Sequence, residues 1–414
     1  MNSRERVLAA IRHKEPDRVP VDFGAMRSTG ITALAHVRLK RHLGLAGPVQ
    51  VYDLVQQLAQ PEDEILDRFG IDAVDLGRAF LTDPAEWRPW TLPDDAPCLV
   101  PAYFNPERQE NGDWVARDAD GDIVARMYHG AFYFNQEIHP LEDVPPDKWA
   151  DSLPAAMAKV SWAALPSPPY HIPLDDAGLA RIAETAKAFH GQTDRAIMVA
   201  FGGNLLEWGQ FLRGFGNLLF DLMAEPAALE RLLDRLVELH LENLRKILDA
   251  FGDAVDLIQF GDDLGTGAAL QMSPEMYRRF FKPRQKKLFG YVRERGGPHV
   301  FLHSCGSIRE IIGDLIDAGV EVLNPVQTSA HGMDPAELKR EFGRDVTFWG
   351  GGCDTAHVLP RGTVQDVRRC VLERLEIFSK GGGYVFNQVH NVTPEVPPEN
   401  VVAMFEAVRE FNGG

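Results

Sequence analysis

The sequence contains few cysteines and no long apolar run. Four cysteines in 414 residues are too few for the disulfide framework that small secreted domains use. No stretch of about 18 apolar residues occurs, so no membrane-spanning helix is predicted. The first six residues also lack the apolar core of a secretory signal. We therefore expect a cytoplasmic protein whose thiols stay reduced and free to bind a metal.

Basic tracts are also absent. The formal net charge is −17, and no more than two lysines or arginines are consecutive. Nucleic acids and anionic membranes attract basic surfaces, so neither is expected as a partner. With 45% hydrophobic and 25% charged residues, the composition is that of an ordinary globular protein. A small-molecule substrate is therefore the expected ligand.

Short apolar runs typical of buried strands recur along the chain and alternate with amphipathic helical patterns. The eight runs are residues 21–23, 73–77, 196–201, 255–260, 300–302, 320–323, 346–349 and 384–386. Alternating strands and helices give a parallel sheet, and eight such units predict an α/β fold, a closed (β/α)8 TIM barrel, over residues 1–414 as one domain. An open doubly wound sheet is the alternative, but no glycine-rich dinucleotide fingerprint follows the first run.

Residues 80–170 interrupt this alternation. They are rich in proline, glycine and aromatic residues, and the strand-like pieces 114–116 and 123–125 flank a turn with three aspartates at 118–122. The turn lacks the spacing and the closing glutamate of a calcium-binding EF-hand. We predict a β-rich insertion after the second barrel strand, which forms either a lid over the barrel mouth or a homodimer contact.

The residues that follow three of the predicted strands include soft metal ligands. His303 and Cys305 are two residues apart, so in a strand both side chains point to one face. Cys353 follows the seventh run and His390 the eighth, and barrel strands end on one shared face. Buried cysteine in a chance His-x-Cys pair is the alternative. We predict that His303, Cys305 and Cys353 bind Zn²⁺, with His390 as a fourth ligand or a catalytic substrate contact.

Other polar residues at predicted strand ends complete the candidate site. They are Arg27, Asp75, Asn204, Glu207, Asp262 and Asn387. Arg27 is the only cation of its loop and is predicted to clamp a substrate carboxylate, the alternative being a solvated surface arginine. Asp262 is predicted to be catalytic, although an aspartate there also suits helix capping. The remaining four are assigned to substrate binding.

Three stretches resemble the uroporphyrinogen decarboxylase family. They are residues 15–21, residues 273–280 and residues 387–401, the last beginning with Asn-Gln-Val-His. The resemblance covers most of the chain except residues 80–170 and implies a TIM barrel. The superfamily also contains zinc-dependent, corrinoid-linked methyltransferases, which are marked by His-x-Cys at the fifth strand and a later cysteine. The chain resembles this branch more closely.

The sequence departs from both patterns. The decarboxylases carry two arginines in the loop after the first strand, whereas the matching residues 26–30 keep only Arg27. The methyltransferases place their third ligand, a cysteine, after the last strand, where this chain has His390, and the additional Cys353 follows the seventh strand instead. The resemblance therefore implies a rearranged zinc site.

Two enzymatic functions follow from the resemblance. The first is a zinc-dependent methyltransferase that moves a methyl group between a small methylated substrate or thiol and a corrinoid (methylcobalamin), carried on a partner protein. The second is a metal-free decarboxylase of a tetrapyrrole or a smaller carboxylate, in which Arg27 and an aspartate are the working groups. A barrel that serves only as a binding scaffold is the third alternative.

Overall fold

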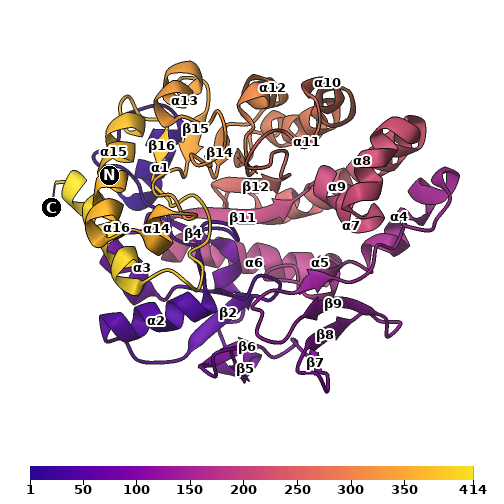
Figure 1. Ribbon diagram of the computed structural model, residues 1–414, viewed down its shortest axis with the longest axis horizontal. Helices are drawn as coiled ribbons and strands as arrows, with labels where there is room; N and C mark the ends of the chain where they lie inside the picture. The colour runs from indigo at the N-terminus through magenta and orange to yellow at the C-terminus, as the bar shows by residue number, and fades with distance from the viewer. Residues whose placement is uncertain (414) are drawn as a thin grey trace.

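Seven parallel strands form the central sheet of the computed structural model, which describes residues 1–413. Their order is β16-β15-β14-β13-β12-β11-β4, so strands that follow one another in the chain lie side by side (Figure 1). The strands are β4 (Ala73–Asp75), β11 (Ala196–Gly202), β12 (Leu257–Gly261), β13 (His299–His303), β14 (Val322–Asn324), β15 (Thr347–Trp349) and β16 (Tyr384–Val385).

Residues 20–23 join the two edges of this sheet. Val21 forms a parallel bridge with Phe386, just beyond β16, and the Phe386 N–H donates to the Pro20 carbonyl at 2.8 Å. On the other side, the Asp72 N–H donates to the Val21 carbonyl at 2.7 Å. The arrangement is TIM-barrel-like. The predicted first strand is present only as this short bridge, since Pro20 has no N–H to donate to a ladder.

The inward-facing side chains of the strands fill the barrel interior. An apolar cluster combines alternate strand residues with residues of helix α1 (Ser3–Ile11). Its members are Val7, Ala10, Ile11, Ala25, Met26, Ala73, Ala196, Met198, Leu257, Phe301, Val322, Trp349 and Val385. The Gly383 N–H, immediately before β16, donates to the Ala10 carbonyl at 2.9 Å. Helix α1 therefore covers the amino-terminal end of the barrel and leaves the carboxyl-terminal end for polar residues.

Helices cover the outside of the barrel (Figure 1). They are α2 (Ala33–Leu43), α3 (Asp63–Phe69), α6 (Asp176–Gln192), α7 (Leu206–Arg213), α8 (Phe215–Ala224), α9 (Pro226–Phe251), α10 (Pro274–Met276), α11 (Lys282–Glu294), α12 (Ile312–Ala318), α13 (Pro335–Phe342), α14 (Val358–Arg361), α15 (Val364–Phe378) and α16 (Pro398–Phe411). Apolar residues at helical spacing, such as Leu229, Leu233 and Leu236 of α9, are buried against the sheet and its neighbours. No helix within residues 1–413 has the length and apolar character to cross a membrane.

Two smaller, mostly antiparallel sheets lie beside the barrel. One sheet has the order β1-β3-β2-β6-β5 and another the order β10-β9-β8-β7. The strands are β1 (Ile31–Thr32), β2 (Val49–Asp53), β3 (Leu58–Ala59), β5 (Trp87–Thr91), β6 (Pro97–Pro101), β7 (Glu107–Arg108), β8 (Trp114–Arg117), β9 (Ile123–Met127) and β10 (Asn135–Gln136). The strands expected at 114–116 and 123–125 are β8 and β9.

The strands beside the barrel extend beyond the insertion predicted at residues 80–170. Strands β1, β2 and β3 precede the barrel strand β4, and β2 pairs in parallel with β6. Within the predicted stretch, residues after β10 form the helices α4 (Trp149–Met157) and α5 (Ser161–Ala164). In β2, apolar residues alternate with polar ones in Val49-Gln50-Val51, which is the pattern of a half-buried strand.

The acidic turn between β8 and β9 holds a side-chain cation. The Lys159 Nζ atom lies 3.1 Å from carboxylate oxygens of Asp120 and Asp122 and 3.6 Å from one of Asp118. This ammonium offsets part of the negative charge of the three carboxylates.

Candidate metal centre

Strand β13 and the residues directly after it bring two candidate metal ligands to the carboxyl-terminal end of the barrel. His303 is its last residue, and the N–H of Cys305 donates to Asp263 Oδ1 at 2.9 Å. Gly306 then turns the chain with φ of 90°, and a Cβ at this position would lie 2.4 Å from the Gly265 backbone. Only glycine fits such a turn. The Cys305 Sγ atom is thereby held 3.3 Å from His303 Nε2.

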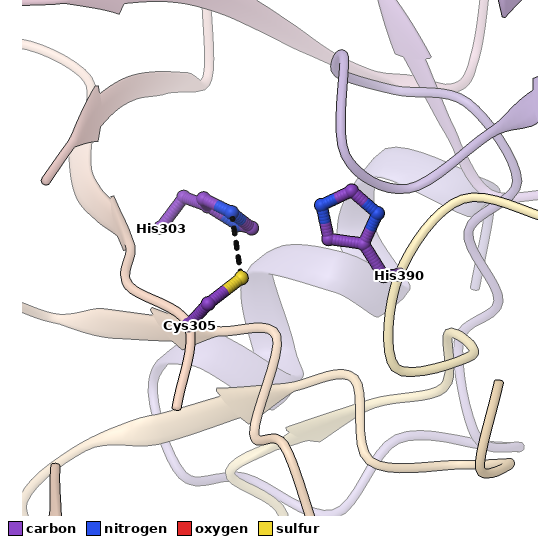
Figure 2. Close-up of side chains that lie close together, drawn as sticks. All are labelled: His303, Cys305 and His390. Atoms are coloured by element: carbon purple, nitrogen blue, oxygen red, sulfur yellow. Dashed lines mark hydrogen bonds between the residues drawn. The ribbon is translucent and has the colours of Figure 1, made fainter. Parts of the chain in front are cut away.

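His390 reaches the same point from the loop after β16. The side chain of the next residue, Asn391, accepts the Gly30 N–H at 2.9 Å and so fixes this loop against the loop after the first bridge. The imidazole centroids of His303 and His390 are 5.6 Å apart. Figure 2 shows the His390 ring facing His303 and Cys305 from the opposite side. One ligand atom from each of these three residues lies within 4.8 Å of the other two.

Asn324 sets the tautomer of His303. The Asn324 Nδ2 atom donates to the Trp349 carbonyl at 2.8 Å, so its Oδ1 atom is the one that faces His303 Nδ1 at 2.6 Å. His303 must therefore carry its proton on Nδ1 and donate it to Asn324. The Nε2 lone pair is left free on the side of Cys305, which is the arrangement of a metal-binding histidine.

Carboxyl groups flank the ligand group. Asp263 Oδ1 lies 3.6 Å from His303 Nε2, and Glu207 Oε2 accepts the Asp263 N–H at 3.3 Å. Burial, together with the Asp263 charge, raises the pKa of the Cys305 thiol. Burial and the charges of the neighbouring aspartates raise the pKa of Glu207, so that Glu207 holds a proton near neutral pH. Burial and the nearby His303 lower the pKa of His390, which therefore stays neutral and able to bind a metal.

Cys353 lies outside this group, and its prediction as the third zinc ligand does not fit the structure. Its side chain is fully buried, and the neighbouring Cys370 thiol in α15, together with burial, raises the pKa of the Cys353 thiol. Its carbonyl accepts the Val389 N–H at 3.0 Å. Cys353 therefore packs the loop after β15 against the loop that carries His390, and His390 takes the third place in the ligand group.

The Asp262 carboxylate is occupied by helix α7, so the structure gives it a structural position instead of the predicted catalytic one. It accepts the N–H groups of Leu205 at 2.8 Å and Glu207 at 3.1 Å, and the Gln285 side chain at 3.3 Å. These bonds cap the first turn of α7. Burial raises the pKa of Asp262 to about 7. The carboxylate that faces the ligand group is that of the adjacent Asp263.

Asn387, predicted to bind substrate, holds two loops together through its amide nitrogen. Its side chain is fully buried, and its Nδ2 atom donates to the carbonyls of Asp22 and Thr29, both at 3.0 Å. These bonds tie the end of β16 to the loop that carries Arg27. The amide is thereby used to position two loops of the barrel mouth.

Of the predicted substrate-binding candidates, Asp75 ends β4, Asn204 follows β11, and Glu207 lies in the first turn of α7. The Asp75 carboxylate accepts the Gly77 N–H, and burial raises its pKa to about 7. The Asn204 side chain bonds to Glu207, and its carbonyl faces His240 Nε2 at 3.1 Å. Of these three residues, Glu207 is linked to the ligand group by hydrogen bonds. It accepts the Asp263 N–H, and Asp263 in turn accepts the Cys305 N–H.

Arg27 lies across the mouth with two partners that the sequence did not point to. Its Nε atom is 3.4 Å from Asp53 Oδ2, and its guanidinium lies over the Trp162 ring at 5.5 Å from the centroid. Asp53 ends β2, a strand that was not predicted. The alternation of apolar and polar residues in β2 could have revealed the strand from the sequence. Gln56 and Tyr133 also reach this region, and no sequence motif marks either of them.

The carboxyl-terminal half of the chain is similar to known proteins. A family model described as uroporphyrinogen decarboxylase (URO-D) matches residues 193–411, a stretch that contains His303, Cys305 and His390. A protein named uroporphyrinogen decarboxylase from Methylococcus capsulatus is 30% identical over 227 residues, 53% of this chain and 61% of its own length. One of the same name from Thermus thermophilus is 31% identical over 196 residues, 46% of this chain and 50% of its own length. The chain thus spans about half the length of the curated relatives it matches.

A solved structure also matches along the whole chain. A methyltransferase from Methanosarcina mazei has a TM-score of 0.58 and 19% sequence identity, and the match covers 99% of both chains. A likeness at this level of identity establishes the shared fold. The reaction has to be argued from the site itself.

Proposed function

The chain belongs to the uroporphyrinogen decarboxylase family, and we propose that it is a zinc-dependent methyltransferase within that family. The family indicates an enzyme, either a decarboxylase or a methyltransferase. The single observation that favours the methyltransferase is the convergence of His303, Cys305 and His390. Decarboxylation as considered above needs no metal, whereas a methyl transfer that begins or ends on sulfur or oxygen gains from one.

The donor set suits zinc. Zinc binds histidine nitrogen at about 2.0–2.1 Å and cysteine sulfur at about 2.3 Å, and donor atoms around one such ion lie roughly 3–4 Å apart. The separation of 3.3 Å between Cys305 Sγ and His303 Nε2 falls in this range. The Asp263 carboxylate, 3.6 Å from His303 Nε2, adds negative charge beside the donor atoms and favours a cation. With three protein ligands, a fourth position would remain for substrate, as in catalytic zinc sites.

Zinc bound here would stabilise a thiolate or polarise an ether oxygen. The chain supplies the remaining functions. Asn324 holds His303 in the binding tautomer. Glu207, which keeps a proton near neutral pH, is placed to give that proton to the oxygen or sulfur atom that loses the methyl group. Arg27 is placed to hold a substrate anion.

The second methyl carrier is proposed to be a corrinoid on a partner protein, in line with the methyltransferase branch that the sequence resembles. Decarboxylation of a carboxylate substrate is the second candidate function. The observation in its favour is that the curated relatives, at about 30% identity, are named uroporphyrinogen decarboxylase. Arg27 would serve as the anion clamp in either reaction, so it does not distinguish them.

An activity comparison tests the proposal. We expect the purified protein to transfer methyl groups between methylcobalamin and thiols, or from methoxy compounds to reduced cobalamin, as followed by cobalamin absorbance. The His390→Ala variant should lose about 100-fold or more of this activity, because it removes a metal ligand. Carbon dioxide release from uroporphyrinogen that persists after chelation and in His390→Ala would instead establish the decarboxylase.

A further inference from the structure

Arg27 presents unused hydrogen-bond donors at the barrel mouth. Its Nε atom faces Asp53 Oδ2 at 3.4 Å, and one face of the guanidinium is covered by the Trp162 ring. Within residues 1–413, its two terminal nitrogens donate to no protein group. The side chain is 23% exposed, so the guanidinium is accessible to a ligand anion. An arginine held in this way binds a carboxylate through a pair of parallel hydrogen bonds.

Gln56 connects the Arg27 loop to the ligand group. Its Nε2 atom donates to the Arg27 carbonyl at 3.4 Å. Its Oε1 atom accepts from Asn391 Nδ2 at 3.3 Å and from the Tyr133 hydroxyl at 3.4 Å. Asn391 is the residue after His390 and also donates to the Arg27 carbonyl, at 2.7 Å. One amide therefore places Arg27, Tyr133 and His390 around the same part of the mouth.

Tyr133 enters this region from the antiparallel part of the chain and is anchored on both sides. The N–H of the next residue, Phe134, donates to the Val55 carbonyl at 2.8 Å, and the Phe134 ring is buried against Phe104. The Tyr133 hydroxyl is turned inward to Gln56, while the residue as a whole is 42% exposed. An aromatic side chain held rigidly over a polar centre, with so much of its surface free, is suited to contact a ligand.

Trp162 belongs to the same unit as Tyr133. The Ser161 N–H donates to Gln136 Oε1 at 2.8 Å, which ties the start of helix α5 to strand β10, three residues beyond Tyr133. Burial, together with the charge of Asp53 and those of Asp263, Cys305 and Glu207, raises the pKa of the Tyr133 hydroxyl. Both aromatic side chains are thus linked to Arg27, Tyr133 through the Gln56 amide and Trp162 through the guanidinium.

We propose that Tyr133 and Trp162 form an aromatic subsite that takes a planar aromatic anion, with its carboxylate on Arg27 and its ring between the two side chains. Within the proposed function, on which this assignment of substrate class rests, the ligand would be an aromatic acid whose methylated heteroatom reaches the ligand group. An aliphatic anion of equal charge would satisfy Arg27 and would leave the two aromatic faces without a partner.

Ligand binding measured apart from the reaction tests this subsite. The full-length protein, before and after removal of metal by chelation, is titrated calorimetrically with 4-methoxybenzoate and with cyclohexanecarboxylate. The two probes carry the same charge, but only the first is planar. We expect the wild type to prefer 4-methoxybenzoate about tenfold, since stacked aromatic contacts add to the area buried, and Tyr133→Leu to abolish this preference.

Tyr128→Leu is the matched control. Tyr128 lies in the same segment, is 52% exposed, and its hydroxyl faces Glu137 at 3.3 Å, away from Gln56. The Tyr128→Leu variant should therefore keep the preference for the planar probe. A Trp162→Leu variant tests the second aromatic side chain in the same way. Thermal unfolding of all variants distinguishes loss of the subsite from loss of folding.

Two results would overturn the subsite: equal binding of both probes by the wild type, or a preference that survives in both Tyr133→Leu and Trp162→Leu. The titration does not depend on catalysis. A wild type that prefers the planar probe but transfers no methyl group would contradict the proposed function and leave the subsite standing.

Discussion

Replacement of Cys305 by serine is expected to lower the zinc content of the purified protein from about one ion per chain to nearly none. The change removes the only thiolate of the ligand group and substitutes a neutral oxygen, which is a poor zinc ligand. Loss of a group that merely supports a metal ligand costs about 10–100-fold in affinity. Loss of the ligand itself should therefore weaken zinc binding by about 100-fold or more, as measured by competition with a chromophoric chelator.

Cys353→Ala is the control for this experiment. Both residues are cysteines at strand ends of the same barrel, but Cys353 lies against Cys370. We expect Cys353→Ala to bind zinc as the wild type does, with some loss of thermal stability from the buried cavity. Equal loss of zinc in the two variants would show that Cys353 binds the metal after all.

The zinc affinity is expected to depend on pH. Burial and the Asp263 charge raise the pKa of the Cys305 thiol, so at neutral pH the metal-free protein holds this sulfur protonated. Zinc needs the thiolate, so its binding releases this proton, and the measured affinity should rise with pH by up to about tenfold per unit. Below neutral pH His390 adds little to this slope, because burial keeps it neutral.

Replacement of Asp72 by asparagine should destabilise the whole barrel. The Asp72 side chain is fully buried, and one oxygen accepts from Arg6 at 2.7 Å and from Arg18 at 2.8 Å. The other oxygen accepts the Val21 N–H at 3.0 Å, where the sheet edges meet. Removing one partner of a buried ion pair leaves the other charge uncompensated, at a cost of about 3–5 kcal/mol. The urea midpoint of unfolding should fall accordingly.

Asp63→Asn provides the comparison for Asp72→Asn. Asp63 also pairs with an arginine, Arg78, at 2.9 Å, but its side chain is 73% exposed. Exposed pairs contribute about 0–1 kcal/mol, so this variant should unfold close to the wild type. If Asp72→Asn behaved in the same way, the joining of the sheet edges at Val21 would not depend on the buried pair.

The barrel strands could be predicted from the sequence because each is a short apolar run beside an amphipathic helix. The strand at residues 21–23 was predicted from its apolar run, but the structure forms only a bridge there, next to Pro20. Strand β2 was missed, since its five residues carry only a brief alternation. The antiparallel layer was placed too late in the chain for that reason.

The metal group could be predicted only in part. The spacing of His303 and Cys305 is local and is readable from the sequence, since a strand places both on one face. The choice between Cys353 and His390 depends on how two loops fold over the barrel, and the contacts of Asn391 and Cys370 that decide it link distant parts of the chain. Asp262 and Asp263 are adjacent, so the sequence could not tell which of them faces the site.

The central claim is that His303, Cys305 and His390 bind zinc together. Zinc K-edge X-ray absorption of the purified, zinc-loaded protein tests it most directly. The structure predicts one sulfur at about 2.3 Å and two imidazole nitrogens at about 2.0–2.1 Å, with further scattering from a light atom at the open position. A protein that binds no zinc, or a spectrum with two sulfur ligands, would contradict it.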